Sequence, residues 1–267
     1  MQDPDRPSAA LDGAVLRQAL RAWPFYVDVE STPATGSTNA DVAALARQGA
    51  PEGTVRSTDH QVAGRGRLAR TWTSPPRAGI AVSVLLRPTA IPRDRWTWLP
   101  LLAGVVVART VARAGVEARL KWPNDVLVDG GKIAGILVEV VGAGAPDALV
   151  VGLGLNVSNE LAELPPGGTS LALAGAAQLD RVTVLTDLLG DLAATYGSWR
   201  EGGGDQAGLR PAYLARCDTI GREVAVELPG GRTVRGVGRT VDLDGRLVVS
   251  TASAQLALSA GDVVHVR

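Results

Sequence analysis

Three arginines and two glycines stand within one short segment, Gly64 to Arg70, and Trp72 follows closely. Arginine presents a planar, permanently charged fork that pairs with phosphate and carboxylate oxygens. Glycine lets the main chain approach a ligand closely. The segment therefore predicts a binding loop for a small anion, such as a nucleotide or an acyl phosphate. A solvated arginine-rich turn is the plainer alternative.

The charge distribution favours a defined ligand over general nucleic-acid binding. From His60 to Arg93 the chain has no Asp or Glu, yet over its whole length 27 basic residues balance 27 acidic ones. A nucleic-acid-binding domain is usually basic as a whole. Positive charge gathered on a neutral background points instead to one site for an anionic ligand.

Two polar turns add candidate ligand contacts. Ser37-Thr38-Asn39 precedes an alanine-rich run, so main-chain N–H groups and hydroxyls point outward together at a helix start. Lys121-Trp122-Pro123-Asn124-Asp125 places an amide and a carboxylate on a turn stiffened by proline. Each also has a plain structural interpretation, as an N-cap and as ordinary turn chemistry.

Two glycine-containing segments complete the series. Gly131 to Glu139 carries one lysine, Lys132, at the start of an otherwise apolar strand. An ammonium there would hold a carboxylate and a phosphate, although an edge lysine is the alternative. Gly152 to Val157 leaves two positions without side chains beside Asn156, which suits close approach of a flat ligand.

Apolar spacing predicts the elements that must position these residues. Helices are expected at 11–21, 40–48, 96–114 and 182–200, with a last one ending near Arg216. Strands are expected at 79–86, 126–128, 133–141 and 148–157, with a hairpin turn at Asp129-Gly130-Gly131. After Cys217, short alternating strands separated by Gly-containing turns predict a small β-barrel.

Composition excludes several classes of site. One cysteine, Cys217, allows no internal disulfide, and two histidines allow no histidine-rich metal centre. The polar N-terminus has no signal-peptide pattern, and no run of 18 apolar residues occurs. We therefore expect a cytoplasmic protein without a membrane contact.

Taken in order, these motifs resemble the biotin–protein ligase family, the biotin–[acetyl-CoA-carboxylase] ligases. The matching residues are Ser37-Thr38-Asn39, Gln61, Gly64 to Arg67, Trp72, Lys121 to Asp125, Gly131-Lys132, Gly135 to Leu137 and Gly152 to Asn156. One departure is Ala69, where the family usually has glycine. The resemblance covers roughly residues 35–267 and is closest to the monofunctional form, since no helix-turn-helix pattern precedes Thr38.

The resemblance implies an α+β fold. A mixed β-sheet catalytic domain with packed helices, of the class II synthetase-like and biotin–lipoyl ligase-like type, is followed by a small SH3-like β-barrel. The expected division is an N-terminal segment at 1–25, a catalytic ligase domain at 26–217 and the SH3-like domain at 218–267.

The resemblance also implies the reaction. ATP and biotin give biotinyl-5′-AMP, and a lysine of a biotin carboxyl carrier protein domain, from an acyl-CoA or pyruvate carboxylase, then takes the biotinyl group. Lys132 and Arg67 are the expected catalytic residues, and Asp125 is a possible contact to magnesium-bound ATP. The expected substrate-binding residues are Ser37, Thr38, Asn39, Gln61, Gly64, Arg65, Gly66, Arg67, Arg70, Trp72, Asn124, Lys132, Gly135, Gly154 and Asn156.

Three alternatives remain at this point. A lipoate–protein ligase or octanoyltransferase shares the fold and the acyl transfer to lysine, but its apolar ligand needs no polar contacts of the kind that Ser37-Thr38-Asn39 offers. A nucleic-acid-binding protein would use the arginine loop and the barrel. A biotin-responsive repressor would need a DNA-binding domain.

Overall fold

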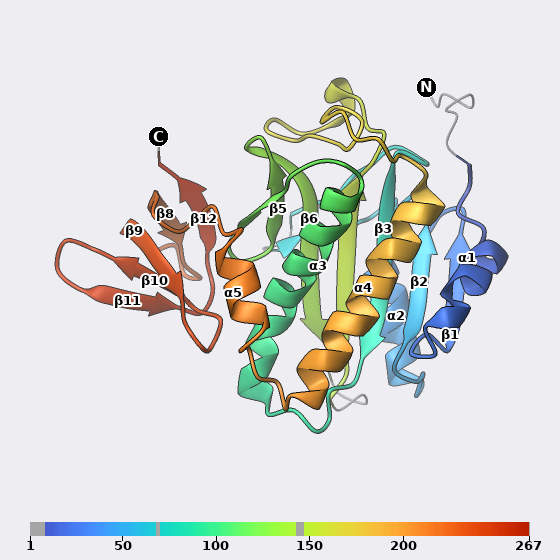
Figure 1. Ribbon diagram of the computed structural model, residues 1–267, viewed down its shortest axis with the longest axis horizontal. Coiled ribbons are helices and arrows are strands. Elements are labelled where there is room, and N and C mark those ends of the chain that lie inside the picture. Colours follow the sequence, from blue (N-terminus) through green and yellow to red (C-terminus); the bar gives the residue numbers. More distant parts are fainter. Residues whose placement is uncertain (1–8, 68–69, 143–146, 267) are drawn as a thin grey trace.

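A mixed β-sheet forms the centre of the larger part of the molecule (Figure 1). The computed structural model describes residues 9–67, 70–142 and 147–266, so Ala69 lies outside the described residues. In that part of the chain the sheet has strands β1 (Asp28–Thr32), β2 (Thr54–Thr58), β3 (Gly79–Leu86), β4 (Arg119–Lys121), β5 (Asp125–Val128), β6 (Gly131–Val140) and β7 (Leu149–Asn156). Their order is β1-β2-β3-β7-β6-β5-β4, with β1 parallel to β2 and the other neighbours antiparallel.

Helices cover both faces of this sheet. They are α1 (Gly13–Ala19), α2 (Thr38–Arg47), α3 (Leu99–Arg113), α4 (Arg181–Glu201) and α5 (Leu209–Leu214), with 3-10 turns η1 (Leu20–Ala22), η3 (Arg93–Trp98) and η4 (Leu161–Glu163). The helices predicted at 40–48 and 182–200 are confirmed as α2 and α4. The helix predicted at 96–114 begins as η3 and continues as α3, and that at 11–21 is α1 followed by η1.

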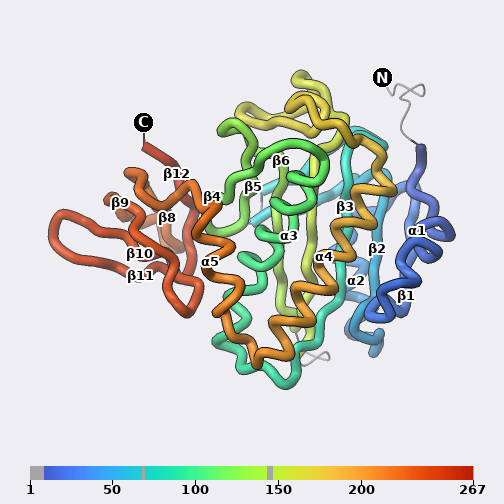
Figure 2. The backbone as a smooth tube through the Cα atoms, viewed as in Figure 1, coloured from blue at the N-terminus to red at the C-terminus, as the bar shows by residue number. Residues whose placement is uncertain are grey.

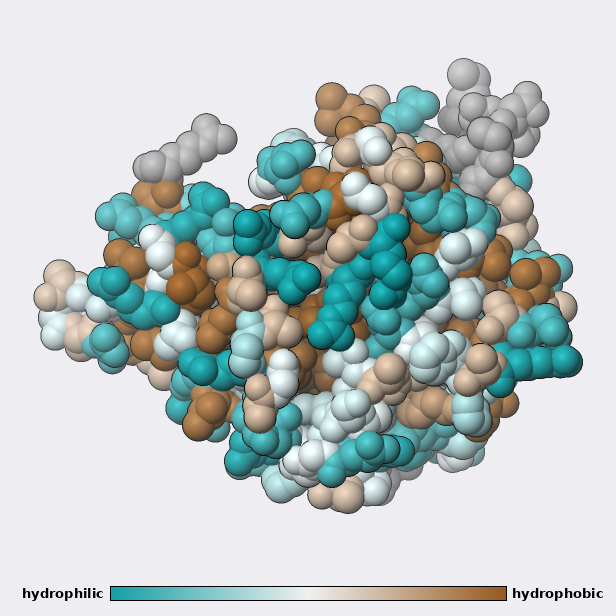
Figure 3. All heavy atoms as spheres, viewed as in Figure 1, coloured by the Kyte–Doolittle hydropathy of each residue, from teal (hydrophilic) through white to brown (hydrophobic). Residues whose placement is uncertain are grey.

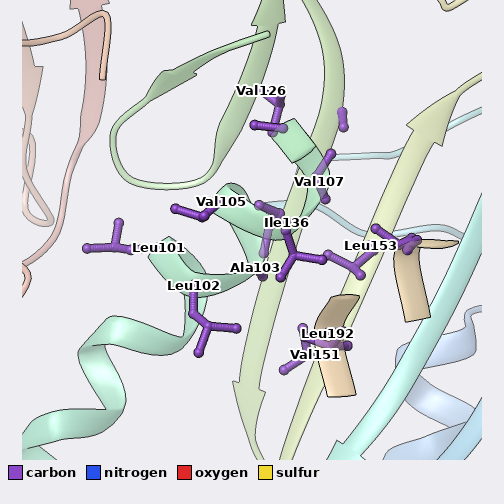
Figure 4. Packing of buried hydrophobic residues seen from close by; sticks show 14 of the residues in the cluster. Leu101, Leu102, Ala103, Val105, Val107, Val126, Ile136, Val151, Leu153 and Leu192 are labelled. Atoms are coloured by element: carbon purple, nitrogen blue, oxygen red, sulfur yellow. The ribbon is translucent and has the colours of Figure 1, made fainter. Parts of the chain in front are cut away.

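Alternation along the strands separates two cores. Even-numbered residues of β3, such as Val82 and Val84, join a large cluster with α3 and α4, whereas Leu85 joins a small cluster with Val42 and Ala46 of α2. Figure 4 shows the large cluster, where α3 packs against Ile136 and Leu153 of the two central strands. The α2 face of the sheet is therefore only partly covered by a helix, and the rest of it is free to form a site.

The opposite face of the molecule is closed by α3 and α4. Arg113 of α3 forms ion pairs with Asp187 and Asp191 of α4, with N–O distances of 3.7 and 2.5 Å. Figure 3 shows strongly hydrophilic side chains over these two helices, among paler and more hydrophobic ones. The α3–α4 face of the sheet thus stabilises the fold through its packed helices.

The C-terminal part forms a second sheet. Its strands are β8 (Glu223–Glu227), β9 (Thr233–Val241), β10 (Leu247–Ser250), β11 (Gln255–Leu258) and β12 (Asp262–His265), in the antiparallel order β11-β10-β9-β8-β12. These are the short strands that the sequence predicts after Cys217. Figure 2 shows this sheet beside the β4–β5 edge of the large sheet, with α1 at the opposite, β1 edge.

Two tryptophans fix the small sheet against the large one. The indole N–H of Trp122 donates to the carbonyl of Gly245 at 3.1 Å, and that of Trp98 donates to the carbonyl of Leu243 at 2.7 Å. Both indoles are buried. Because these anchors set the position of the small sheet, side chains of β12 reach the α2 face of the large sheet.

Candidate active site

A cavity of about 340 Å³ lies on the α2 face, beyond the N-terminus of α2. This is within the usual size of small-molecule sites, roughly 300–1,000 Å³. Its lining residues are Ser37, Thr38, Asn39, Gln61, Arg65, Gly66, Arg67, Arg70, Thr71, Trp72, Asn124, Asp125, Lys132, Gly135, Ile136, Leu137, Gly152, Leu153, Gly154, Pro165 and Asp262. Every residue that the sequence singles out for the site lines it, except Gly64 and Asn156.

One end of the cavity is polar and belongs to the start of α2. Ser37 is the N-cap residue, yet in the described structure its side chain makes no capping hydrogen bond, so its hydroxyl is not used by the helix. The main-chain N–H and the hydroxyl of Thr38 both donate to Oε1 of Gln61, at 2.9 and 3.1 Å. These three residues make the polar end of the cavity, where a polar part of a ligand would be recognised.

Asn39 secures this polar end. Its amide nitrogen donates to the carboxylate of Glu139 at 2.7 Å and to the carbonyl of Leu137 at 3.3 Å, both on β6. Its Oδ1 lies 2.6 Å from the hydroxyl of Ser83. A Cβ on Gly152 would come within 2.0 Å of that Oδ1, so glycine leaves the room that the Asn39 amide occupies. Asn39 thus bonds α2 to β6 and β3 and packs against β7.

Two glycines form a flat floor in the middle of the cavity. Gly135 of β6 and Gly154 of β7 are direct partners across the ladder. The Trp72 ring lies on them, since a Cβ on Gly154 would be 2.5 Å from its Cε2 and one on Gly135 would be 3.1 Å from its Cζ3. A side chain at either position would fill the space that the indole occupies.

The other end of the cavity is cationic. Lys132 Nζ lies 2.6 Å from Oδ1 of Asp125, and Lys121 Nζ lies 3.6 Å from Oδ2 of the same carboxylate. The Lys132 ammonium also lies 5.9 Å from the centre of the Trp72 ring, within the range of a cation–π contact. Two ammonium groups sharing one carboxylate leave net positive charge at this end.

The cavity is elongated along the strands. Leu137, opposite Gly152 at the polar end, is five residues from Lys132 on β6. At roughly 3.3 Å per residue, their Cα atoms are about 16 Å apart. A ligand with a polar head, an apolar middle and an anionic end would match this order of groups.

The three loop arginines are held by three different parts of the fold, namely β6, the turn before β5, and β12. Arg65 forms an ion pair with Glu139 of β6 at 3.4 Å. Arg67 donates to Oδ1 of Asn124 at 3.1 Å, and Arg70 forms an ion pair with Asp262 of β12. Burial lowers the pKa of Arg67, while the carboxylates of Asp262 and Asp125 raise it. The predicted anion-binding loop therefore has its charges gathered at the cavity.

Gly64 supports the loop from outside the cavity. Its carbonyl accepts from the N–H of Trp72 at 2.9 Å, and a Cβ on Gly64 would lie 2.4 Å from the carbonyl oxygen of Trp72. A side chain would therefore separate the two ends of the loop. Asn156 also lies outside the lining, because its amide nitrogen donates to the carbonyl of Thr169 at 2.9 Å.

Asp125 contacts two lysines in the described structure. Both of its carboxylate oxygens face ammonium groups, and the described residues contain no group of three or more His, Cys, Asp or Glu that could hold a metal ion. Magnesium that accompanies a nucleotide takes most ligands from phosphates and water. Asp125 is therefore the counter-ion of Lys132 in the described structure, and its contact to magnesium-bound ATP stays a prediction.

Some lining residues have no signal in the sequence. Asp262 comes from the small sheet, 192 positions after Arg70, and no local pattern marks it. Pro165 comes from an irregular segment after β7. Gly152, in contrast, is part of the glycine series that the sequence shows.

In the described part of the chain, no helix is long and apolar enough to cross a membrane.

Comparisons with known proteins agree with this geometry. Residues 31–156 match the family described as Biotin/lipoate A/B protein ligase, and residues 219–266 match the Biotin protein ligase C terminal domain. A biotin–[acetyl-CoA-carboxylase] ligase of Mycobacterium tuberculosis is 43% identical over 273 residues, covering 100% of both chains. The bifunctional ligase/repressor BirA of Escherichia coli is 34% identical over 72% of this chain and 60% of its own.

A solved structure shares the architecture. The biotin protein ligase of Aquifex aeolicus in complex with biotin and ATP superposes with a TM-score of 0.75 at 26% identity, covering 89% of this chain and 98% of that one.

Proposed function

The chain belongs to the biotin/lipoate A/B protein ligase family, and we propose that it acts there as a biotin protein ligase. The observation that carries this proposal is the order of groups in the cavity. A polar end made by Ser37, Thr38 and Gln61 is separated by the glycine floor from a cationic end at Lys132. Biotin has the same order, with a polar ureido ring, an apolar chain and a carboxylate.

In the first step, the biotin carboxylate attacks the α-phosphorus of ATP. A P–O bond to the carboxylate forms, the bond to the β-phosphate bridge breaks, and pyrophosphate leaves with the electron pair. Negative charge gathers between two anionic groups, so a fixed cation there lowers the barrier. We assign this role to Lys132, held by Asp125 at 2.6 Å, with Arg67 as the second catalytic cation.

The loop arginines have a second role in this scheme. Arg65, Arg67 and Arg70 would exchange their present partners for the phosphates of ATP and then of the adenylate. Asn124, the present partner of Arg67, would contact the phosphates together with it. Such charge-assisted forks hold phosphate well. They would also keep the reactive adenylate from water until the acceptor arrives.

In the second step, a lysine amine attacks the acyl carbon of biotinyl-5′-AMP. The C–N bond forms, the C–O bond to the phosphate breaks, and AMP leaves with the electron pair while the nitrogen loses its proton. We infer that the acceptor is a biotin carboxyl carrier domain of an acyl-CoA or pyruvate carboxylase. Because the reaction consumes ATP, we place it in the cytoplasm, with magnesium supplied together with the nucleotide.

Pyrophosphate exchange tests the ligand. Radiolabelled pyrophosphate should enter ATP when biotin is present, and it should not do so when lipoate or octanoate replaces biotin. Those apolar chains offer no hydrogen-bonding group to the polar end formed by Ser37, Thr38 and Gln61, so they should bind there more weakly than a polar ring does. Exchange that depends on lipoate and not on biotin would refute the proposal.

A further inference from the structure

A buried serine lies beneath the polar end of the cavity. Ser83 of β3 stands on the α2 face of the sheet, two residues before Leu85, and its side chain is fully buried. Its hydroxyl oxygen lies 2.7 Å from Oγ1 of Thr38 and 2.6 Å from Oδ1 of Asn39. A serine hydroxyl carries one proton, so it can donate fully to only one of these two oxygens.

The side-chain amide of Asn39 has a fixed orientation. Its Nδ2 donates to the carboxylate of Glu139 at 2.7 Å and to the carbonyl of Leu137 at 3.3 Å. A carboxylate and a carbonyl only accept hydrogen bonds, so the nitrogen must face them and Oδ1 must face Ser83. Because Oδ1 has no proton, its 2.6 Å contact is a hydrogen bond only if the Ser83 hydroxyl donates to Asn39.

This direction determines the next bond in the chain. Ser83 gives its proton to Asn39, so the 2.7 Å contact between the two hydroxyl groups needs the proton of Thr38. The Thr38 hydroxyl thus has two acceptors within reach, Ser83 Oγ at 2.7 Å and Gln61 Oε1 at 3.1 Å. The first distance is ideal for a bond between oxygens and the second is long, so the bond to Ser83 is the stronger.

The same arrangement leaves acceptors at the cavity. Gln61 Oε1 accepts the main-chain N–H of Thr38 at 2.9 Å, which uses one of its two lone pairs. When the hydroxyl proton of Thr38 stands toward Ser83, the other lone pair of Gln61 is free. Thr38 and Gln61 both line the cavity, so its polar end then presents two acceptor oxygens 3.1 Å apart.

We propose that Ser83 is a specificity-determining residue, which takes the proton of Thr38 and so makes the polar end select a ligand ring that presents an N–H there. This rests on the proposed function, in which the ureido ring of biotin occupies the polar end. A ring oxygen at the same place would bring a lone pair against Thr38. Thr38 could turn its proton to that oxygen only by leaving the buried Ser83 without a donor.

The cost of that turn gives the expected size of the effect. A buried polar group that loses its partner weakens a complex about 5- to 150-fold. The ligands to compare with biotin are its two cyclic carbamate analogues, each with a ring oxygen in place of one ureido N–H. Isothermal titration without ATP should show that the wild type binds at least one of them about 5- to 150-fold more weakly than biotin. Binding of biotin and both analogues within about threefold of one another would overturn the proposal.

Ser83→Ala should remove this selectivity. Without Ser83, Thr38 can donate to a ring oxygen or to Gln61 and leave no buried hydroxyl unpaired. The ratio of the two Kd values, for the rejected analogue and for biotin, should therefore fall at least about fivefold. A general loosening of the site would weaken both ligands alike and keep the wild-type ratio, and that result would overturn the proposal.

Ser57→Ala is the matched control. Ser57 is a serine of the neighbouring strand β2 with 1% exposure. It stands opposite Val82, whose side chain joins the large cluster, so Ser57 lies on the face away from the cavity. This variant should keep the wild-type ratio. If Ser83→Ala does not fold, Ser83→Cys fills the same place with a weak acceptor, and the same fall in the ratio is expected.

Neutron diffraction from crystals of the deuterated, ligand-free protein reads the direction of the bonds without any ligand. The deuteron of Ser83 should point to Asn39 Oδ1, and that of Thr38 should point to Ser83 Oγ. A Ser83 deuteron directed at Thr38, or a Thr38 deuteron directed away from Ser83, would overturn the proposal. If the wild type binds biotin no more tightly than lipoate, the proposed function fails, and the deuteron positions still decide whether Ser83 directs Thr38.

Discussion

A methyl group at Gly154 should disturb biotin binding through Trp72. The added Cβ of Gly154→Ala would stand 2.5 Å from Cε2, 2.7 Å from Cζ2 and 2.8 Å from Nε1 of the indole. Carbon atoms in good contact are about 3.5–4.0 Å apart, so the ring must move by about 1 Å or more. The glycine floor would therefore no longer be flat, and the Trp72 ring would no longer lie on it.

The size of the effect follows from this overlap. Forcing an extra methyl group into a packed contact costs about 1–3 kcal/mol. If this cost weakens the complex with biotin, the Kd for biotin rises about 5- to 150-fold, since about 1.4 kcal/mol is a factor of ten. Gly135→Ala should have a smaller effect, because its Cβ would be 3.1 Å from Trp72 Cζ3 and 3.4 Å from Lys132 Cε. A shift of a few tenths of an ångström relieves those contacts.

Isothermal titration of biotin into each variant measures the effect. Gly197→Ala in α4 is the control, because an added Cβ there meets nothing within 4 Å. It should bind biotin like the wild type. If Gly154→Ala binds biotin as tightly as the control, or if Gly135→Ala is the weaker binder, the glycine floor does not support the ligand.

Three further predictions concern charged groups. Lys132→Ala should lower biotin-dependent pyrophosphate exchange by a factor of about 100 or more, since one preorganised charge contributes roughly 3 kcal/mol to the transition state. Its melting temperature should be unchanged. Near-normal exchange would show that Lys132 takes no part in the chemistry. Arg67→Gly should release biotinyl-5′-AMP about 10- to 100-fold faster than the wild type. Serum albumin incubated with this variant, ATP and biotin should therefore carry more biotin than albumin incubated with the wild type. Equal labelling would show that Arg67 does not retain the adenylate. Arg181→Met should lower the free energy of unfolding in urea by about 3–5 kcal/mol, because it breaks a buried ion pair with Asp59 at 2.7 Å. Arg113 is exposed, so Arg113→Met should lower it by less than about 1 kcal/mol. Equal losses in the two variants would contradict this difference.

The longest helices and the buried central strands are predictable because burial follows their apolar pattern. Strands β1 and β2 are not predicted, and their composition explains why. Thr54, Ser57 and Thr58 of β2 are nearly inaccessible, yet all three are polar. Their hydroxyls bond to main-chain carbonyls, as Thr58 Oγ1 does to Thr32 at 2.9 Å. An apolar pattern does not identify a short buried strand whose polar groups are satisfied in this way.

The cavity is predictable where its residues are grouped in motifs, and less so where the fold brings them together. Ser37, Lys132 and the glycines stand in short motifs with a clear chemical use. Asp262 is added only because two tryptophan anchors place the small sheet beside the arginine loop. The division into 1–25, 26–217 and 218–267 stays a prediction.

We propose that this chain joins biotin to a lysine of a carrier domain. The most direct test is the mass of a biotin carboxyl carrier domain after incubation with the protein, ATP and biotin. One biotinyl group should be added at a single lysine, the addition should require ATP, and Lys132→Ala should abolish it. A carrier mass that stays unchanged with active wild-type protein, or a carrier that gains a lipoyl group and no biotinyl group under matched conditions, would contradict this function.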